Sequence, residues 1–378
     1  MEHPPPILSA VVTGGTGFVG CGIVRMLQHI HPECSITVLD LQIPSPHDDH
    51  RFVPKIAYEK LDITDREALL DCVARIKPAL VIHAAGRIPS VPLLLKAKKE
   101  PDIFDKINVE GTRNVLDASE KAGVKAFVLT SSADVVKGDN WENHEGINED
   151  VPYPKTWTDP YARSKVPKSP PLLSFNSFEP LLTLQQALAE QLVLSRATDT
   201  FLTAAIRPHA VFGPHDPNII AMWHSVLKKP LGTRVMIDPE TNLYDFTYID
   251  NCAFGHILAA ECLLALKPPH SGLVSGKAFF LTDAEPITLR KMLFMIWKGF
   301  GHERGWCFTM PKTLMYGMVW MGEKIAGLGG GAPLLTTGML GDTQSVRWYD
   351  CSRAKVVLGY NPMVGREEAI RRTCAVVP

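Results

Sequence analysis

The chain has 378 residues, of which 46% are hydrophobic and 21% charged, and its formal net charge is −1. This composition is ordinary for a folded protein with a large core, and the near-neutral charge excludes the basic field that nucleic-acid binding requires. The eight cysteines have neither C-x-x-C nor metal-ligand spacing. We therefore expect reduced thiols in an intracellular compartment and no metal site. The chain contains no secretory signal pattern and no apolar run long enough to cross a bilayer.

The first strong pattern is a glycine-rich turn between a predicted strand and a predicted helix. Residues 8–12 form a short apolar run, TGGTGFVG follows at 13–20, and apolar residues then recur at helical spacing. In this context, glycines let the backbone approach a pyrophosphate and the helix N-terminus faces its charge. An ordinary tight turn would need only one glycine, so Gly14, Gly17 and Gly20 together favour a dinucleotide site.

Asp40 ends the second predicted strand, at 35–39. A carboxylate there can accept hydrogen bonds from the ribose hydroxyls of a dinucleotide and would repel a 2′-phosphate. Leu41 and Gln42 follow, with no Arg or Lys at hand to bind that phosphate. The pattern favours NAD over NADP, although a surface Asp at a strand end is the simpler alternative.

Further strands end in residues suited to a ligand. The third strand ends at LDITD, where Asp62 could reach an adenine amine and Asp65 could cap a helix. The fourth, at 80–85, ends in small residues against which a cofactor could lie. The fifth, at 126–130, precedes Ser131 and Ser132, whose hydroxyls would face the crevice at the carboxyl edge of the sheet.

The alternation of strands and helices predicts an α/β fold, a Rossmann-type doubly wound parallel sheet with a smaller C-terminal substrate-binding lobe. We expect residues 1–210 to form the NAD-binding domain. Residues 211–378 would form the mixed substrate-binding lobe, with some segments returning to the core. In this lobe, Leu314, Met318, Met321 and Ile325 have helical spacing. We interpret this stripe as core or substrate-pocket wall rather than a membrane anchor.

Tyr161 and Lys165 lie four residues apart, so on a helix they share a face. An ammonium group beside a phenol favours the phenolate and so suits the Tyr to proton transfer. Residues 166–186, however, contain four prolines where this helix should continue. We predict that the first helix stops near Lys165 and that a second begins near Leu184.

Two explanations of residues 166–186 compete. They are either a natural surface loop or a retained intron. The 21 residues keep the reading frame, a Val codon begins with GT, and one Gln codon ends in AG. Removing them joins YARSK to ALAEQLVL as one continuous amphipathic helix, and for this reason we favour the retained intron.

The motifs together resemble the extended short-chain dehydrogenase/reductase superfamily. They look most like its 3β-hydroxysteroid dehydrogenase branch, especially the fungal sterol-4α-carboxylate 3-dehydrogenases (decarboxylating). The resemblance covers nearly the whole chain outside residues 166–186, and its matching segments are TGGTGFVG, LDITD, HAAG, NVEGTRNVLDA, LTSSADVV, YARSK, IRPHAVFGP, FTYIDNCAFGHILAA, FFLTD and YDCSRAKVVLGYNP. The glycine turn and Y-x-x-x-K are generic to the superfamily, whereas FTYIDN and the late LTD are more particular to this branch.

The resemblance implies that Tyr161 is the general base and that Lys165 binds the nicotinamide ribose. Ser132, in preference to Ser131, would hydrogen-bond the reacting oxygen. Asn108 would belong to the same catalytic set, unless it only satisfies backbone groups. NAD would be the cofactor, and its implied contacts are Gly14, Gly15, Thr16, Gly17, Phe18, Val19, Gly20, Asp40, Asp62, Ile63, Ala84, Ala85, Gly86, Lys165 and Pro208.

The implied reaction is oxidation of a sterol or triterpenoid 3β-hydroxyl. If carbon 4 carries a carboxyl group, the resulting β-keto acid loses CO2 without a dedicated residue, and His209 is a candidate partner for that carboxylate. The resemblance also suggests a homodimer, peripheral membrane contact, and a cytoplasmic or endoplasmic-reticulum location. Two alternatives stay open: a nucleotide-sugar epimerase or dehydratase on this fold, and an NAD-binding protein impaired by residues 166–186.

Overall fold

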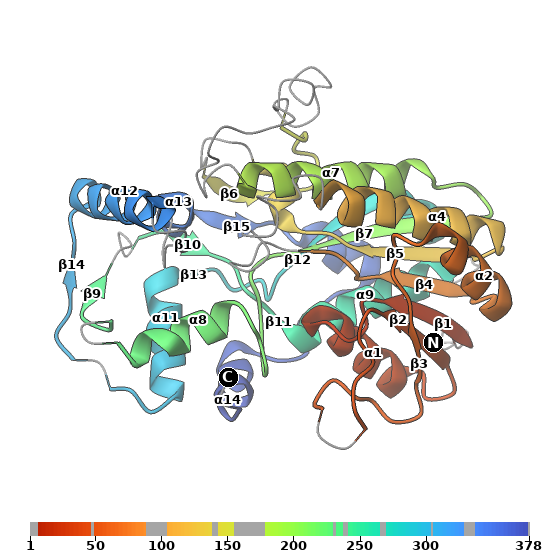
Figure 1. Cartoon of the computed structure of the whole chain (residues 1–378), viewed down its shortest axis with the longest axis horizontal. Coiled ribbons are helices and arrows are strands. Elements are labelled where there is room, and N and C mark those ends of the chain that lie inside the picture. The colour runs from red at the N-terminus through yellow and green to blue at the C-terminus, as the bar shows by residue number, and fades with distance from the viewer. Residues whose placement is uncertain are drawn as a thin grey trace.

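A seven-stranded parallel sheet forms the centre of the computed structural model, in the order β12-β7-β5-β4-β1-β2-β3 (Figure 1). Its strands are β1 (Ser9–Thr13), β2 (Ser35–Asp40), β3 (Ala57–Lys60), β4 (Leu80–His83), β5 (Ala126–Thr130), β7 (Leu202–Pro208) and β12 (Lys277–Leu281). The structure describes residues 7–46, 49–87, 104–137, 143–154, 178–229, 232–236, 241–264, 270–303, 305–328 and 337–376. The strand order reverses between β1 and β4, where such sheets bind ligands. The predicted fold class is confirmed.

Helices cover both faces of this sheet. Helices α1 (Phe18–Ile30) and α9 (Ile249–Leu264) lie on one face. The other face carries α2 (Arg66–Ile76), α4 (Gly111–Lys121) and α7 (Phe178–Ser195). Successive strand residues point to opposite layers: Ala10 and Val12 pack toward α1 and α9, whereas Val11 packs toward α2 and α4. The strands read as continuous apolar runs because both faces are covered.

The remaining elements form a lobe beside the sheet, built around a second core of Trp223, Phe246 and Ile296. Its helices are α8 (Ile219–Leu227), α11 (Leu289–Gly299), α12 (Lys312–Leu328), α13 (Thr337–Gln344) and α14 (Arg366–Cys374). Its short strands are β8 (Val211–Phe212), β9 (Val235–Met236), β10 (Leu243–Tyr244), β11 (Thr247–Tyr248), β13 (Ile287–Thr288), β14 (Phe308–Thr309) and β15 (Arg347–Tyr349), with β6 (His144–Ile147) joining the β10–β15 sheet. Smaller helical segments are η1 (Asp105–Glu110), η2 (Ala133–Val136), α10 (His270–Val274) and η4 (Ala354–Leu358).

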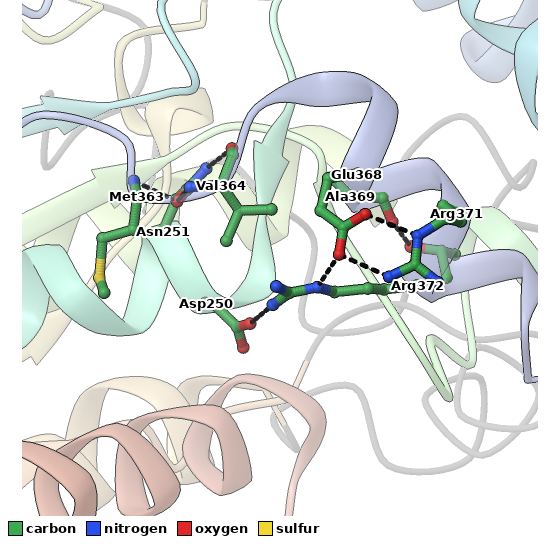
Figure 2. A network of polar contacts seen from close by, with 9 residues as sticks. Asp250, Asn251, Met363, Val364, Glu368, Ala369, Arg371 and Arg372 are labelled. Carbon is green, nitrogen blue, oxygen red and sulfur yellow. Dashed lines mark hydrogen bonds and ion pairs between the residues drawn. The ribbon is translucent and has the colours of Figure 1, made fainter.

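The first turn of α9 fastens the C-terminal segment to the core (Figure 2). The fully buried Asn251 accepts hydrogen bonds from the N–H groups of Met363 and Val364, at 2.8 and 2.9 Å. Its amide nitrogen donates to the carbonyl of Val364 at 2.9 Å. Arg372 of α14 connects Glu368 to Asp250, at 2.7 and 3.4 Å. The FTYIDN segment thus holds together parts of the chain more than a hundred residues apart.

Two expectations of local structure are wrong. Helix α7 begins at Phe178, six residues before the predicted start at Leu184. Pro180 is the third residue of this helix, where its missing N–H has no intrahelical partner to lose. The apolar stripe of α12 is helical as predicted, but its four side chains are 55–64% exposed, so its interpretation as core is wrong, whereas its interpretation as a substrate-pocket wall stays a prediction.

Candidate active site

The turn between β1 and α1 leaves no room for side chains at Gly14 and Gly20. Gly14 has a φ of +69°, and a Cβ atom added to it would lie 2.6 Å from the Cα of Ala85. A Cβ atom at Gly20 would lie 2.1 Å from the carbonyl oxygen of Gly14. No side chain caps the first turn of α1 at Gly17, so the N–H groups of this first turn are available to an anion. The turn, the start of α1 and the end of β4 therefore meet at one point of the carboxyl edge.

Asp40 points its carboxylate at this turn. Its Oδ2 atom accepts a hydrogen bond from the N–H of Thr16 at 3.0 Å, and its Oδ1 atom accepts one from the N–H of Leu41 at 2.7 Å. The expectation that no cation lies near is wrong, since Arg51 interacts electrostatically with Asp40. The Arg51 guanidinium also binds Asp49, with its Nε 2.8 and 2.9 Å from the two carboxylate oxygens. Asp49 thus pairs with the cation that interacts with Asp40.

The adenine side of the predicted cofactor site lies at the end of β3. Asp62 is exposed, and its Oδ1 accepts hydrogen bonds from the N–H and the hydroxyl of Thr64, at 2.9 and 2.8 Å. Ile63 is buried against Gly111, where an added Cβ atom would lie 2.6 Å from the Ile63 side chain. Asp65 caps α2 as predicted, accepting a hydrogen bond from the N–H of Ala68.

Asn108 is buried, and its amide group binds the backbone of Arg87. Its Oδ1 accepts from the Arg87 N–H at 2.8 Å, and its Nδ2 donates to the Arg87 carbonyl at 3.1 Å. His83 lies beneath it, between the hydroxyls of Thr13 at 2.6 Å and Thr112 at 2.9 Å. Burial lowers the pKa of His83 to about 4, so the imidazole is neutral. Both side chains fix the segment after β4 beside the glycine turn.

The two predicted serines differ in their contacts. The buried Ser131 hydroxyl has no hydrogen-bond partner among the described residues. The half-buried Ser132 caps η2, because its Oγ accepts from the N–H of Asp134 at 3.1 Å. Thr130 donates to the Nε2 of His256 at 2.9 Å, since the Nδ1–H of His256 is directed to the carbonyl of Cys252. The Ser132 hydroxyl also donates a long hydrogen bond to the Oδ2 of Asp134, at 3.4 Å, at the carboxyl end of β5.

Tyr161 and Lys165 lie outside the described residues. What the structure describes instead is the helix α7, which packs beside η1, η2, α4 and β7. The fully buried Glu190 of α7 binds Arg207 of β7, with the Arg207 Nη2 2.6 Å and its Nε 3.0–3.1 Å from the carboxylate oxygens. The hydroxyl of Tyr153 donates to the same carboxylate. This contact sets the rotation of α7 about its axis.

A group of buried charged side chains lies next to Ser132. Burial raises the pKa of Asp134, but Lys137, His209 and Arg347 outweigh this and lower its pKa below the ordinary value. The Arg347 guanidinium is 3.3 Å from the Nδ1 of His144, whose pKa burial lowers to about 4. The residue predicted as a carboxylate partner, His209, is buried and donates from its Nδ1 to the carbonyl of Asp245.

Sequence reasoning missed most of this group and also the Glu190–Arg207 pair. The signals were single charged residues inside apolar segments, such as Arg207 in LTAAIRP and Arg347 in SVRWY. A charge within an apolar strand is costly unless it is paired, so such residues indicate a buried partner. The sequence does not reveal which partner, because Glu190 and Arg207 belong to different elements.

Comparison with known proteins finds a matching family model and relatives of nearly full length. Residues 11–176 and 168–312 match the sequence model of the 3-beta hydroxysteroid dehydrogenase/isomerase family, and the two matches overlap at residues 168–176, within the segment 166–186. The chain is 30% identical to the Saccharomyces cerevisiae protein "Sterol-4-alpha-carboxylate 3-dehydrogenase ERG26, decarboxylating", with 97% of each chain covered. It is 29% identical to the human "Sterol-4-alpha-carboxylate 3-dehydrogenase, decarboxylating", covering 96% of this chain and 86% of the human one.

Solved structures with the same fold include nucleotide-sugar epimerases. The UDP-glucose 4-epimerase of Thermotoga maritima has a TM-score of 0.67 at 19% identity, covering 97% of this chain and 98% of the other. The Thermus thermophilus UDP-glucose 4-epimerase, solved with NAD, has a TM-score of 0.66 at 21% identity, with the same coverage. At this identity the likeness establishes the fold alone.

Proposed function

The chain belongs to the 3-beta hydroxysteroid dehydrogenase/isomerase family, and we propose that it oxidises the 3β-hydroxyl of a C4-carboxylated sterol or triterpenoid with NAD, releasing CO2. The observation that carries this proposal is the full-length similarity to decarboxylating sterol-4-alpha-carboxylate 3-dehydrogenases. In this proposal, residues 1–210 bind the cofactor and residues 211–378 bind most of the substrate. The enzyme would act in sterol C4 demethylation or in related secondary metabolism.

The carboxyl edge of the sheet fits NAD. The glycine turn provides the close approach that a pyrophosphate needs, because side chains at Gly14 and Gly20 would collide with backbone atoms. Asp40 lies where a ribose hydroxyl can donate to its carboxylate, and it disfavours a 2′-phosphate. Small residues at 84–86 leave the end of β4 open to the rest of the cofactor.

In the proposed reaction, bound NAD supplies the acceptor for the hydride that leaves carbon 3. Tyr161 takes the proton of the substrate hydroxyl, and Lys165 stabilises the phenolate that this role requires. Ser132 donates its hydroxyl proton to the reacting oxygen and so orients it. Asn108 acts as a positioning residue, because its amide is engaged with the backbone of Arg87.

Decarboxylation follows from the chemistry of the product. Oxidation turns the substrate into a β-keto acid, in which the bond between carbon 4 and the carboxyl carbon breaks as CO2 leaves. The bonding electrons pass into the carbon-3 ketone as an enolate, which a proton then quenches at carbon 4. We assign the binding of the substrate carboxylate to the positive side of the buried group next to Ser132, which contains Lys137 and Arg347 with His209 beside them.

The first residues of α7 indicate whether the active enzyme is the 378-residue chain or a chain that lacks residues 166–186. Gln185 is fully buried, and neither atom of its amide group has a partner among the described residues. A buried polar group without a partner costs about 1–3 kcal/mol. If Lys165 were joined directly to Ala187, Ser164 would take the position of Gln185, and a small hydroxyl there can bond to the backbone of its own helix.

The same junction would bring Tyr161 and Lys165 into register with Glu190. Lys165 would precede Glu190 by four residues and Tyr161 would precede it by eight, so all three would follow one side of the helix. Leu182 and Gln186 have these positions in the 378-residue chain, and neither residue can serve as the base or the ammonium. We propose that the form lacking residues 166–186 is the active enzyme and that the 378-residue form binds NAD with impaired turnover.

The test compares both forms with NAD and a carboxyl-labelled 4α-carboxysterol. We expect both forms to bind NAD, with NADH formation and CO2 release at least about a hundredfold faster in the shorter form. Equal turnover would refute the role of the insertion. NAD binding without turnover in either form would refute the dehydrogenase, and turnover of UDP-glucose instead would support the epimerase alternative. A peptide from the native protein that joins Lys165 to Ala187 would identify the mature form.

The proposal also includes membrane contact, location in the cell and oligomeric state. A sterol substrate suits peripheral membrane contact and a location at the endoplasmic reticulum. Helix α7, whose side chains near Glu190 are buried within the subunit, would contribute its other side to a homodimer. Size measurement by light scattering tests the dimer.

A further inference from the structure

Asp134 lies within a group of ionisable side chains that come from separate parts of the chain. It belongs to η2, and Lys137 directly follows the same short helix. His144 of β6 and Arg347 of β15 are register partners on neighbouring strands, while His209 follows β7. Each of the other members interacts electrostatically with His144, so they surround one imidazole. We call these five residues the Asp134 group.

The permanent charges of the Asp134 group are two positive and one negative. Lys137 and Arg347 are cationic at neutral pH. Burial raises the pKa of the Asp134 carboxyl, but the charges of Lys137 and its neighbours outweigh this and keep the pKa below its ordinary value, so the carboxyl is ionised. His144 is neutral, because burial lowers its pKa to about 4 and its Nδ1 accepts from the Arg347 guanidinium at 3.3 Å. One positive charge is therefore in excess, and a single carboxylate would neutralise it.

Ser132 and Asp134 form the less buried side of this group. Both residues are half-buried, whereas Lys137 and Arg347 are only 8% and 1% exposed. The Ser132 Oγ accepts from the N–H of Asp134 at 3.1 Å and donates to its Oδ2 at 3.4 Å. A ligand whose hydroxyl is bound by Ser132 therefore meets the Asp134 carboxylate together with the two cations behind it.

Two buried hydroxyls beside the group have no hydrogen-bond partner among the described residues. They belong to Ser131, which is 9% exposed, and to Tyr349, which is 3% exposed. The Tyr349 side chain interacts electrostatically with Asp134 and Arg347, so it lies close to both charges. A purely structural cluster normally satisfies its buried hydroxyls internally. The two hydroxyls are instead what we expect of a site that a polar ligand completes.

We propose that Asp134 is a specificity-determining residue, which sets the positive charge of this site to match a single carboxylate on the substrate. The inference rests on the proposed function, in which Lys137 and Arg347 bind the carboxylate at carbon 4. In the free protein, Asp134 keeps these two buried cations from lacking a counter-ion, a costly state. In the complex, it prevents them from holding the carboxylate so tightly in the ground state that loss of CO2 is slowed.

The test measures sterol binding to the 378-residue protein by equilibrium dialysis in the presence of NADH, which leaves no acceptor for the hydride. The two radiolabelled ligands are a 4α-carboxysterol and the same sterol without the carboxyl group. The variant Asp134→Asn removes the negative charge at nearly constant volume. We expect it to bind the carboxysterol at least about fivefold more tightly and the uncharged sterol with unchanged affinity. The matched control is Asp199→Asn, an exposed residue before β7 at the opposite edge of the sheet, which should bind both ligands like the unaltered protein.

A second pair of variants tests the charge balance. Lys137→Met removes one cation and should weaken carboxysterol binding at least about tenfold. Adding Asp134→Asn to it leaves one excess positive charge, on Arg347, and should recover most of that loss. A merely structural role of Asp134 would change the affinity for both ligands together. Unchanged Tm and NADH affinity would show that each variant is folded.

Two results would overturn the proposal. In one, Asp134→Asn binds the carboxysterol no more tightly than the unaltered protein does, or gains the same affinity for both ligands. In the other, the double variant binds the carboxysterol no better than Lys137→Met. If the unaltered protein binds neither sterol, the proposed function fails and this inference fails with it. If it binds both sterols and Asp134→Asn does not separate them, the inference alone fails.

Discussion

Replacing Glu190 by Leu should destabilise the protein strongly, because it leaves a buried charge without its partner. The side chains of Glu190 and Arg207 are 0% and 3% exposed. Three of the contacts that satisfy Arg207 end on the Glu190 carboxylate, and the Nη1 of Arg207 already has no partner among the described residues. After the substitution, the guanidinium keeps the Tyr153 hydroxyl at 3.2 Å and the rings of Phe280 and Tyr153.

The magnitude follows from the cost of an unpaired buried charge. Removing one partner of a buried ion pair costs about 3–5 kcal/mol of unfolding free energy. The free energy of a typical domain is only about 5–15 kcal/mol, so much of the stability would be lost. The double variant Glu190→Leu/Arg207→Met removes both charges and should be more stable than Glu190→Leu alone, because apolar groups of similar volume often replace a buried pair at little cost.

Urea denaturation, followed by tryptophan fluorescence and circular dichroism, measures these differences. Glu59→Leu is the control, since Glu59 and Arg75, 33% and 62% exposed, form a surface pair at 2.6 Å, and this variant should lose less than about 1 kcal/mol of unfolding free energy. The reasoning is refuted if Glu190→Leu costs less than about 1 kcal/mol, the range of surface pairs. It is also refuted if the double variant is no more stable than Glu190→Leu.

Three further predictions concern the cofactor site and pH. Gly20→Ala should weaken NAD binding at least tenfold in calorimetry, because its Cβ would collide with a backbone oxygen, whereas Gly317→Ala, in open space, should not. Asp49→Ala should raise the NADP-to-NAD affinity ratio several-fold by releasing Arg51 toward Asp40, and adding Arg51→Ala should reverse this. Burial raises the pKa of Asp245 to about 7, so the native carboxyl keeps a proton that the unfolded chain releases near pH 4. Unfolding free energy should therefore fall from about pH 4 to 7, less steeply in Asp245→Asn, and an unchanged slope would contradict this.

The parts of the fold that depend on neighbouring residues could be predicted from the sequence. The glycine turn, the Asp at the end of β2 and the N-cap Asp65 each follow from a pattern within a few residues. The parallel strands were recognisable because they are apolar throughout, and this in turn follows from helices on both sides of the sheet. These patterns were enough to locate the carboxyl edge and the serines that follow β5.

What the sequence did not reveal depends on contacts between distant segments. Arg51 is eleven residues beyond Asp40, and its approach depends on the path of the loop between β2 and β3. The stripe of α12 resembles a buried stripe in composition, but α12 packs on α13 through Met315 and Val319, and the stripe itself is exposed. Periodicity reports that a helix has an apolar side but not what covers that side.

Helix α7 depends both on local sequence and on a contact with a distant segment. The position of its second half is fixed by the ion pair between Glu190 and Arg207. This pair involves no residue that precedes Ala187. A first half of suitable helical sequence can therefore extend it, whether this is FEPLLTLQQ or YARSK. Local propensity accepts both, but only the second supplies a phenol and an ammonium group on the side of Glu190. A sequence that can form the first half of α7 is therefore not always one that can perform the chemistry. The buried amide of Gln185, which has no partner among the described residues, indicates that FEPLLTLQQ fits this position less well than YARSK would.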